Sequence, residues 1–84
     1  MSKIKIKNFP TYEIYYKTTR RLIPGYFVIV SIYYMPIFDL SEIKFYLTKV
    51  HKSFFVPIKK TLDPTQYENL VMVLMEFLKD RFFV

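Results

Sequence analysis

The sequence Leu62-Asp63-Pro64-Thr65-Gln66-Tyr67 marks the point at which the periodicity of the chain changes. Asp63 has the residue type of a helix N-cap, and Pro64 suits the first turn of a helix, where no backbone N–H donor is needed. From Tyr67 onward apolar residues recur every three or four positions, which is typical of an amphipathic helix. The pattern predicts a C-terminal helix over residues 63–82.

The apolar stripe of this predicted helix is wider than one sheet face needs to cover, because Met75 and Val73 widen it at its edges. A second copy of the same helix is the simplest cover for the excess. We therefore expect a homodimer that pairs through the helix. The predicted dimer interface consists of Tyr67, Leu70, Val71, Leu74, Phe77 and Leu78.

Upstream of the helix, apolar residues alternate with polar ones, as they do in half-buried strands. Strands are expected over residues 3–7, 12–17, 26–34, 42–50 and 54–60, separated by a basic connection at 18–25, a loop at 35–41 and a turn at 51–53. Residues 26–34 are the most apolar and are expected to be central and buried on both faces, whereas Pro57 predicts an edge strand or a bulge. The predicted fold is α+β: a four- to five-stranded antiparallel sheet (residues 2–60) and one C-terminal helix in a single domain, 1–84.

The composition argues against catalysis. The 84 residues include no Cys, one His and one Gly, which excludes disulfides, thiolate chemistry and a glycine-rich phosphate loop. His51 lies in a predicted turn without a nucleophile partner, and the carboxylates are scattered. We expect no enzyme activity, no metal site and no cofactor.

Residues 22–38 carry no charge and approach the length of a membrane-spanning helix. This run contains Pro24, Gly25 and Pro36, and its β-branched and aromatic centre favours a buried strand over a helix. The N-terminal alternation of Lys with Ile lacks the apolar core of a signal peptide. The sequence therefore predicts an intracellular protein without a membrane partner.

Positive charge is concentrated in the predicted sheet. Residues 1–60 hold eleven basic and three acidic residues, whereas residues 61–84 hold two basic and four acidic ones. Cations that neutralise phosphates, interleaved with aromatic rings that stack on bases, are what binding of a single nucleic-acid strand requires. The acidic, apolar helix is unsuited to the major groove of a duplex.

We therefore predict binding of single-stranded nucleic acid with low sequence specificity. Tyr15 and Tyr46 are expected to stack on bases. The residues expected to neutralise phosphates are Lys3, Lys5, Lys7, Lys17, Arg20, Arg21, Lys44, Lys49, Lys59 and Lys60.

Two other interpretations remain open. Lysines on outer strand faces also prevent aggregation between sheets. The second interpretation starts from the composition. The lack of Ala and Trp beside abundant Ile, Lys, Tyr and Phe is typical of an AT-rich genome, such as that of many phages and viruses. The alternative function is a small viral or phage accessory protein that binds a host protein through an aromatic surface.

The helix entry, residues 62–70, resembles the Leu-Thr-x-Glu-Gln-Trp-x-x-Leu segment of the positive-cofactor-four transcriptional coactivators, with Tyr67 in place of the Trp. Pro57-Ile58-Lys59-Lys60 is similar to that family's Pro-x-Lys-Lys before the helix. The resemblance implies a curved antiparallel sheet followed by one helix, a homodimer paired through its helices, and binding of single-stranded or melted DNA by the sheets. It also implies a role in transcription or, for phage members, in replication and recombination.

Overall fold

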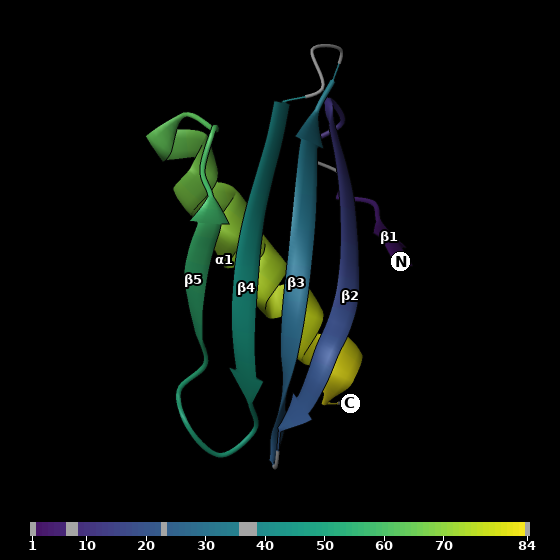
Figure 1. The fold of residues 1–84 in the computed structure, drawn as a ribbon, viewed down its shortest axis with the longest axis vertical. Helices are drawn as coiled ribbons and strands as arrows, with labels where there is room; N and C mark the ends of the chain where they lie inside the picture. Colours follow the sequence, from purple (N-terminus) through teal and green to yellow (C-terminus); the bar gives the residue numbers. More distant parts are fainter. Residues whose placement is uncertain (1, 7–8, 23, 36–38, 84) are drawn as a thin grey trace.

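The computed structural model describes residues 2–6, 9–22, 24–35 and 39–83, apart from the side chains of Arg20 and Leu22. Its five strands are β1 (Ser2–Ile4), β2 (Tyr12–Leu22), β3 (Gly25–Tyr34), β4 (Asp39–Thr48) and β5 (Phe54–Lys59), followed by helix α1 (Pro64–Phe82). All neighbouring strands are antiparallel, and their order in the sheet is their order in the chain. Figure 1 shows α1 lying obliquely behind the sheet. The predicted α+β fold is confirmed, with β3 at its centre.

β2 is longer than the sequence pattern predicts. Residues 18–22, expected to belong to a basic connection, continue the strand and pair with the first half of β3. The register shifts between Thr18 and Arg20, which is a β-bulge. The predicted loop at 35–41 is also too long, because β4 begins at Asp39, while residues 36–38 lie outside the described residues.

Gly25 opens β3 and pairs with Thr48 of β4. A Cβ atom at this position would lie 1.9 Å from the backbone carbonyl oxygen of Leu47, much closer than any real contact. The single glycine of the chain is therefore required by the close approach of two backbones.

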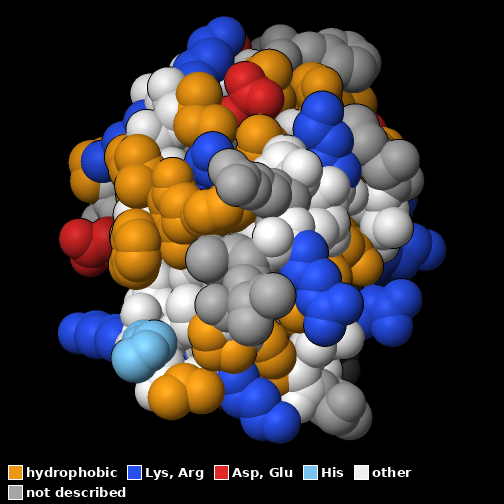
Figure 2. Space-filling view, turned by 60° about the horizontal axis from the view of Figure 1, so that its bottom comes forward, with side chains coloured by type: hydrophobic (Ala, Val, Ile, Leu, Met, Phe, Trp, Pro, Cys, Tyr) orange, Lys and Arg blue, Asp and Glu red, His pale blue; other side chains and the backbone are white. Residues whose placement is uncertain are grey.

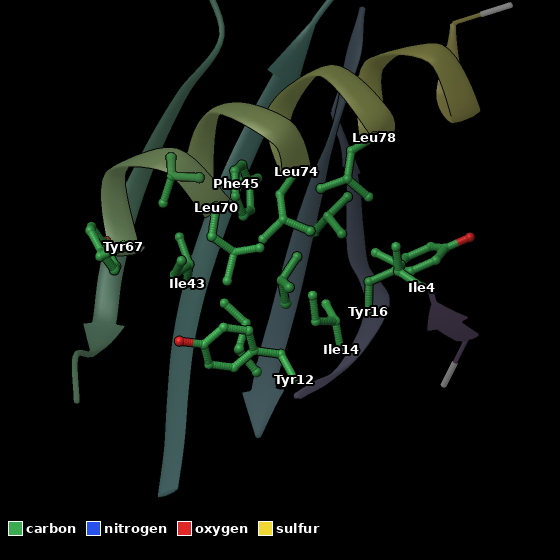
Figure 3. Packing of buried hydrophobic residues seen from close by; sticks show 14 of the residues in the cluster. Ile4, Tyr12, Ile14, Tyr16, Ile43, Phe45, Tyr67, Leu70, Leu74 and Leu78 are labelled. Atoms are coloured by element: carbon green, nitrogen blue, oxygen red, sulfur yellow. The ribbon is translucent and has the colours of Figure 1, made fainter. Parts of the chain in front are cut away.

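The core lies between α1 and one face of the sheet. Alternate residues of the strands, such as Ile14, Val30 and Phe45, meet the apolar stripe of α1, and Leu70, Leu74 and Leu78 are fully buried there (Figure 3). Burying each such side chain contributes about 1.5–3 kcal/mol to folding. The predicted helical stripe is thus explained by packing within the chain.

The entry to α1 is fixed by hydrogen bonds to β4 and β2. The Thr61 backbone N–H donates to the buried Ser41 hydroxyl (2.9 Å), and the two hydroxyls lie 2.8 Å apart. The carboxylate of Asp63 accepts from the backbone N–H of Gln66 (3.4 Å), as the N-cap prediction requires. The Tyr12 hydroxyl donates to the Gln66 side chain and so joins β2 to the first turn of α1.

Tyr67 lies near the N-terminus of α1 and is buried in the core. Its ring packs against Phe55 at 6.3 Å between centroids, and the Lys60 Nζ atom lies 4.6 Å from the ring centroid. The residue is only 6% exposed, yet its hydroxyl has no hydrogen-bond partner among the described residues. Burial raises the pKa of this phenol above its ordinary value of 10.0.

β5 is an edge strand, as Pro57 predicts, and the register with β4 shifts beside it. The Thr48 backbone N–H and carbonyl both bond to the Ser53 hydroxyl, so the backbone of Thr48 faces β5. Backbone direction alternates along a strand, and the pairing therefore turns Val56 toward β4 and Pro57 toward the free edge. Because Pro57 has no backbone N–H, the free edge of β5 lacks a hydrogen-bond donor that a strand from another molecule would need for pairing.

Candidate nucleic-acid interface

The face of the sheet opposite α1, here called the open face, is turned toward the viewer in Figure 1. It consists of the strand residues that alternate with the core residues, and the described part of the chain places no helix over it. Its aromatic members are Tyr15, Phe27, Tyr33, Tyr46 and Phe54, and its lysines are Lys3, Lys17, Lys44 and Lys59. Figure 2 shows Lys and Arg side chains interspersed with hydrophobic ones, with few acidic side chains in that view.

One group on the open face, the Tyr46 cluster, comprises Phe27, Lys44, Tyr46 and Phe54. The Tyr46 and Phe54 rings are stacked, with centroids 4.6 Å apart and planes 15° apart, and Phe27 meets Tyr46 edge-on at 4.6 Å. The Lys44 Nζ atom lies 5.2 Å from the Phe27 ring centroid and 5.5 Å from that of Tyr46. Phe54 is 53% exposed, so a ring surface is available beside a fixed cation.

A second group, the Tyr15 cluster, comprises Lys3, Glu13, Tyr15 and Tyr33. The two tyrosine rings meet edge-on with centroids 6.1 Å apart, and the Lys3 Nζ atom lies 5.9 Å from the Tyr15 ring centroid. Lys3 donates a hydrogen bond of 3.1 Å to the Glu13 carboxylate. That hydrogen bond and the charge of Glu13 raise the pKa of Lys3 above its ordinary value.

The row of residues next to the Tyr46 ring crosses the open face and includes Lys44 of the Tyr46 cluster. Lys17, Ile29, Lys44 and Val56 lie side by side on β2, β3, β4 and β5. Two lysines in this row therefore carry positive charge across the middle of the open face. Along β3, Phe27 and Tyr33 are six residues apart, which corresponds to about 20 Å in an extended strand. The open face thus presents two groups of rings with cations at and between them.

The structure brings together half of the predicted site residues. Lys3, Tyr15, Lys17, Lys44, Tyr46 and Lys59 lie on the open face. Lys5 follows β1 and Lys49 lies after β4, and both are exposed.

The remaining predicted residues are placed elsewhere or are not described. Arg21 lies on the α1 side, where its guanidinium is 5.7 Å from the Tyr26 ring centroid, and Lys60 covers Tyr67 on that same side. These two residues do not lie on the open face, because the bulge after Thr18 changes which residues of β2 point outward and the chain leaves β5 before Lys60. Their role in neutralising phosphates stays a prediction. The backbone of Arg20 pairs with Phe27, but its side chain is outside the described part, as is all of Lys7.

Three open-face rings are absent from the predicted site: Phe27, Tyr33 and Phe54. Residues 26–34 were expected to be buried on both faces, whereas Phe27, Ile29 and Tyr33 are only partly buried. The signal that could have found them is the alternation itself. Once Val28 and Val30 are assigned to the core, the odd-numbered residues of the strand must face outward.

Five of the six residues predicted for the dimer interface lie against the chain's own sheet. Tyr67, Leu70, Val71, Leu74 and Leu78 are buried in the core, while Phe77 remains 37% exposed. Met72, at 72% exposed, is the most exposed large apolar side chain among the described residues of α1. Dimerisation through this helix stays a prediction, and the surface of α1 that is free for it includes Phe77 and Met72 rather than the buried stripe.

The described residues hold no group of three or more His, Asp or Glu side chains that could bind a metal ion. No described helix is long and apolar enough to cross a membrane. His51 lies in the exposed turn between β4 and β5, as the sequence predicts. Its backbone carbonyl accepts a hydrogen bond from the Thr48 hydroxyl, which helps to define the turn.

Comparisons with protein-family models, with curated proteins and with solved structures found no match to this chain. The geometry of the open face and the chemistry of its side chains therefore carry the function proposed below.

Proposed function

We propose that the open face binds single-stranded nucleic acid with low sequence specificity. The observation that carries the proposal is the Tyr46 cluster, in which a lysine ammonium group lies over two aromatic rings beside a half-exposed third ring. Bases stack on such rings whatever their identity, with about 1–3 kcal/mol for each stacked base, and the ammonium group pairs with phosphate. The resemblance to the positive-cofactor-four coactivators favours DNA as the ligand and a role in transcription, replication or recombination.

The test is fluorescence anisotropy of a labelled oligo-dT and of a duplex of equal length, measured over a series of salt concentrations. We expect the single strand to bind more tightly than the duplex. The logarithm of its affinity should fall with the logarithm of salt concentration, with a slope of about −0.7 for each phosphate neutralised. A flat salt dependence, or no binding at low salt, would contradict the proposal.

Two substitutions assign the binding to the open face. Lys44→Gln should weaken binding and make the salt slope shallower by about 0.7, because one phosphate contact is lost. Phe54→Ala should weaken binding by roughly 5- to 150-fold, the equivalent of losing one stacked base.

The matched controls lie on α1, on the other side of the sheet. Lys79→Gln removes the same charge as Lys44→Gln, and Met72→Ala removes an exposed apolar side chain as Phe54→Ala does. Because Met72 lies on the surface of α1 that is free for dimerisation, the oligomeric state of Met72→Ala is first matched to that of the unmodified protein by analytical ultracentrifugation. Both controls should bind the single strand as the unmodified protein does. Equal losses in controls and test variants would mean that overall charge or hydrophobicity, and not this face, determines binding.

A second candidate function is capture of a protein partner through the aromatic surface. The observation in its favour is the apolar exposure of β5, where Phe54, Val56 and Ile58 are 53%, 45% and 53% exposed. Charge reversal of Lys44 and Lys59 separates the two candidates. The double variant should abolish binding of nucleic acid, whereas capture of a protein through the rings would survive it.

A further inference from the structure

The two ring clusters of the open face differ in net charge. In the Tyr15 cluster, the ammonium group of Lys3 is paired with the carboxylate of Glu13 at 3.1 Å, and both side chains are exposed, by 44% and 38%. Within the described part of the chain this is the only such ion pair at 4.0 Å or less. Glu42 also lies on the open face, two residues from Lys44 and opposite Lys59, but no carboxylate of the described residues lies within 4.0 Å of the Lys44 ammonium group. Lys44 is therefore free to pair with a phosphate, whereas Lys3 is already paired.

Glu13 itself lies far from the rings of the Tyr46 cluster. It pairs with Tyr33, and Tyr33 is six residues along β3 from Phe27, a separation of about 20 Å or about twice the Debye length of ~10 Å at 0.1 M salt. Glu13 consequently exerts little electrostatic effect on a phosphate bound at the Tyr46 cluster. It acts strongly on a phosphate at the Tyr15 cluster, where it both occupies Lys3 and repels the ligand directly.

We infer that Glu13 determines how strongly binding depends on the length of the strand, because it keeps the Tyr15 cluster a weak second binding site for a single strand. The inference rests on the proposed function. A short strand binds the Tyr46 cluster alone, and a longer one reaches the Tyr15 rings but gains no phosphate contact from Lys3. The ligand class is therefore an extended single strand that crosses the open face, with its affinity concentrated at the β4–β5 side.

The experiment compares a four-nucleotide with a twelve-nucleotide oligo-dT at 0.1 M salt, using unmodified protein and Glu13→Gln. With its bases stacked at ~3.4 Å each, a four-nucleotide strand spans about 10 Å, half of the ~20 Å between Phe27 and Tyr33, so when bound at the Tyr46 rings it does not reach Glu13. Glu13→Gln keeps the size and the hydrogen-bonding capacity of the side chain but removes its charge. We expect it to tighten binding of the twelve-nucleotide strand about fivefold and to steepen the salt slope by about 0.7. Binding of the four-nucleotide strand, titrated as a competitor, should not change.

Two further variants make the result specific. Glu76→Gln makes the same change in net charge on α1 and should leave binding of both strands unchanged. Lys3→Gln combined with Glu13→Gln should return the affinity for the twelve-nucleotide strand to that of the unmodified protein, because the gain depends on a released Lys3.

The outcomes distinguish this inference from the proposed function on which it rests. If the unmodified protein binds neither strand, the proposed function fails and the inference fails with it. If the unmodified protein binds but Glu13→Gln does not tighten the longer strand, only the inference fails. Equal tightening of both strands, or by Glu76→Gln as well, would overturn the inference in favour of a general effect of net charge.

Discussion

Replacing Tyr67 by Phe removes one oxygen atom from the core and is expected to stabilise the protein. The Tyr67 hydroxyl is buried and has no hydrogen-bond partner among the described residues. A buried polar group that loses its water without gaining a partner costs about 1–3 kcal/mol of folding free energy. The substitution keeps the ring, and with it the contacts to Phe55 and to the Lys60 ammonium group.

Taking the lower end of that range, Tyr67→Phe should raise the free energy of unfolding by about 1 kcal/mol. For a domain of 60–100 residues, this corresponds to a rise in Tm of roughly 4–8 °C. The measurement is thermal unfolding followed by circular dichroism, with urea denaturation as a second probe. The slope of the urea transition should stay unchanged, because the surface exposed on unfolding is nearly the same.

Tyr12→Phe is the matched control, since it deletes the same atom from another buried tyrosine. The Tyr12 hydroxyl donates to the Gln66 side chain, so its removal should lower the free energy of unfolding by about 1 kcal/mol. The two substitutions are thus expected to shift Tm in opposite directions. If Tyr67→Phe lowers Tm as Tyr12→Phe does, the Tyr67 hydroxyl has a favourable partner in the folded protein and the reasoning is refuted.

Two other predictions concern the same fold. Gly25→Ala should lower the free energy of unfolding by about 3 kcal/mol, because its Cβ would overlap the Leu47 carbonyl oxygen; an unchanged midpoint of urea unfolding would contradict the close approach of β3 and β4. Burial is the main cause that raises the pKa of both Tyr12 and Tyr67 in the folded state. The free energy of unfolding should therefore keep the full contribution of the two neutral phenols below about pH 10 and fall as the pH rises beyond it. Tyr67→Phe should lose less stability between pH 9 and 11.5 than the unmodified protein, and equal losses would mean that the Tyr67 phenol does not contribute.

The order of elements and the helix entry could be predicted because they depend on local signals. Alternation of period two gives way to a helical period after Leu62, and Asp63 and Pro64 define the boundary chemically. The extent of β2 could not be predicted in the same way. Residues 18–22 are strongly basic and have no alternating pattern, and they are extended because β3 supplies a full-length pairing partner. That partner is fixed by register, which a local pattern does not contain.

The residues of the candidate site also differ in whether a local sequence pattern could predict them. Lys44 and Tyr46 could be assigned to the outer face because their neighbours Ile43, Phe45 and Leu47 alternate cleanly with them. The rings of Phe27 and Tyr33 could not, because every residue of that central strand is apolar or aromatic except Ser31. Which of its two faces α1 covers is decided by tertiary packing.

The position of α1 after the sheet in the chain has a consequence for biosynthesis. All five strands precede α1, and neighbouring strands in the sheet are neighbours in the chain, so each hairpin can pair as soon as it is made. The 19 residues of α1 then take roughly 1–4 s to translate at ~5–20 residues per second. During that interval Ile14, Val30 and Phe45 have no helix to cover them, and the nascent sheet offers a chaperone, or another nascent chain, the apolar surface that the finished protein conceals.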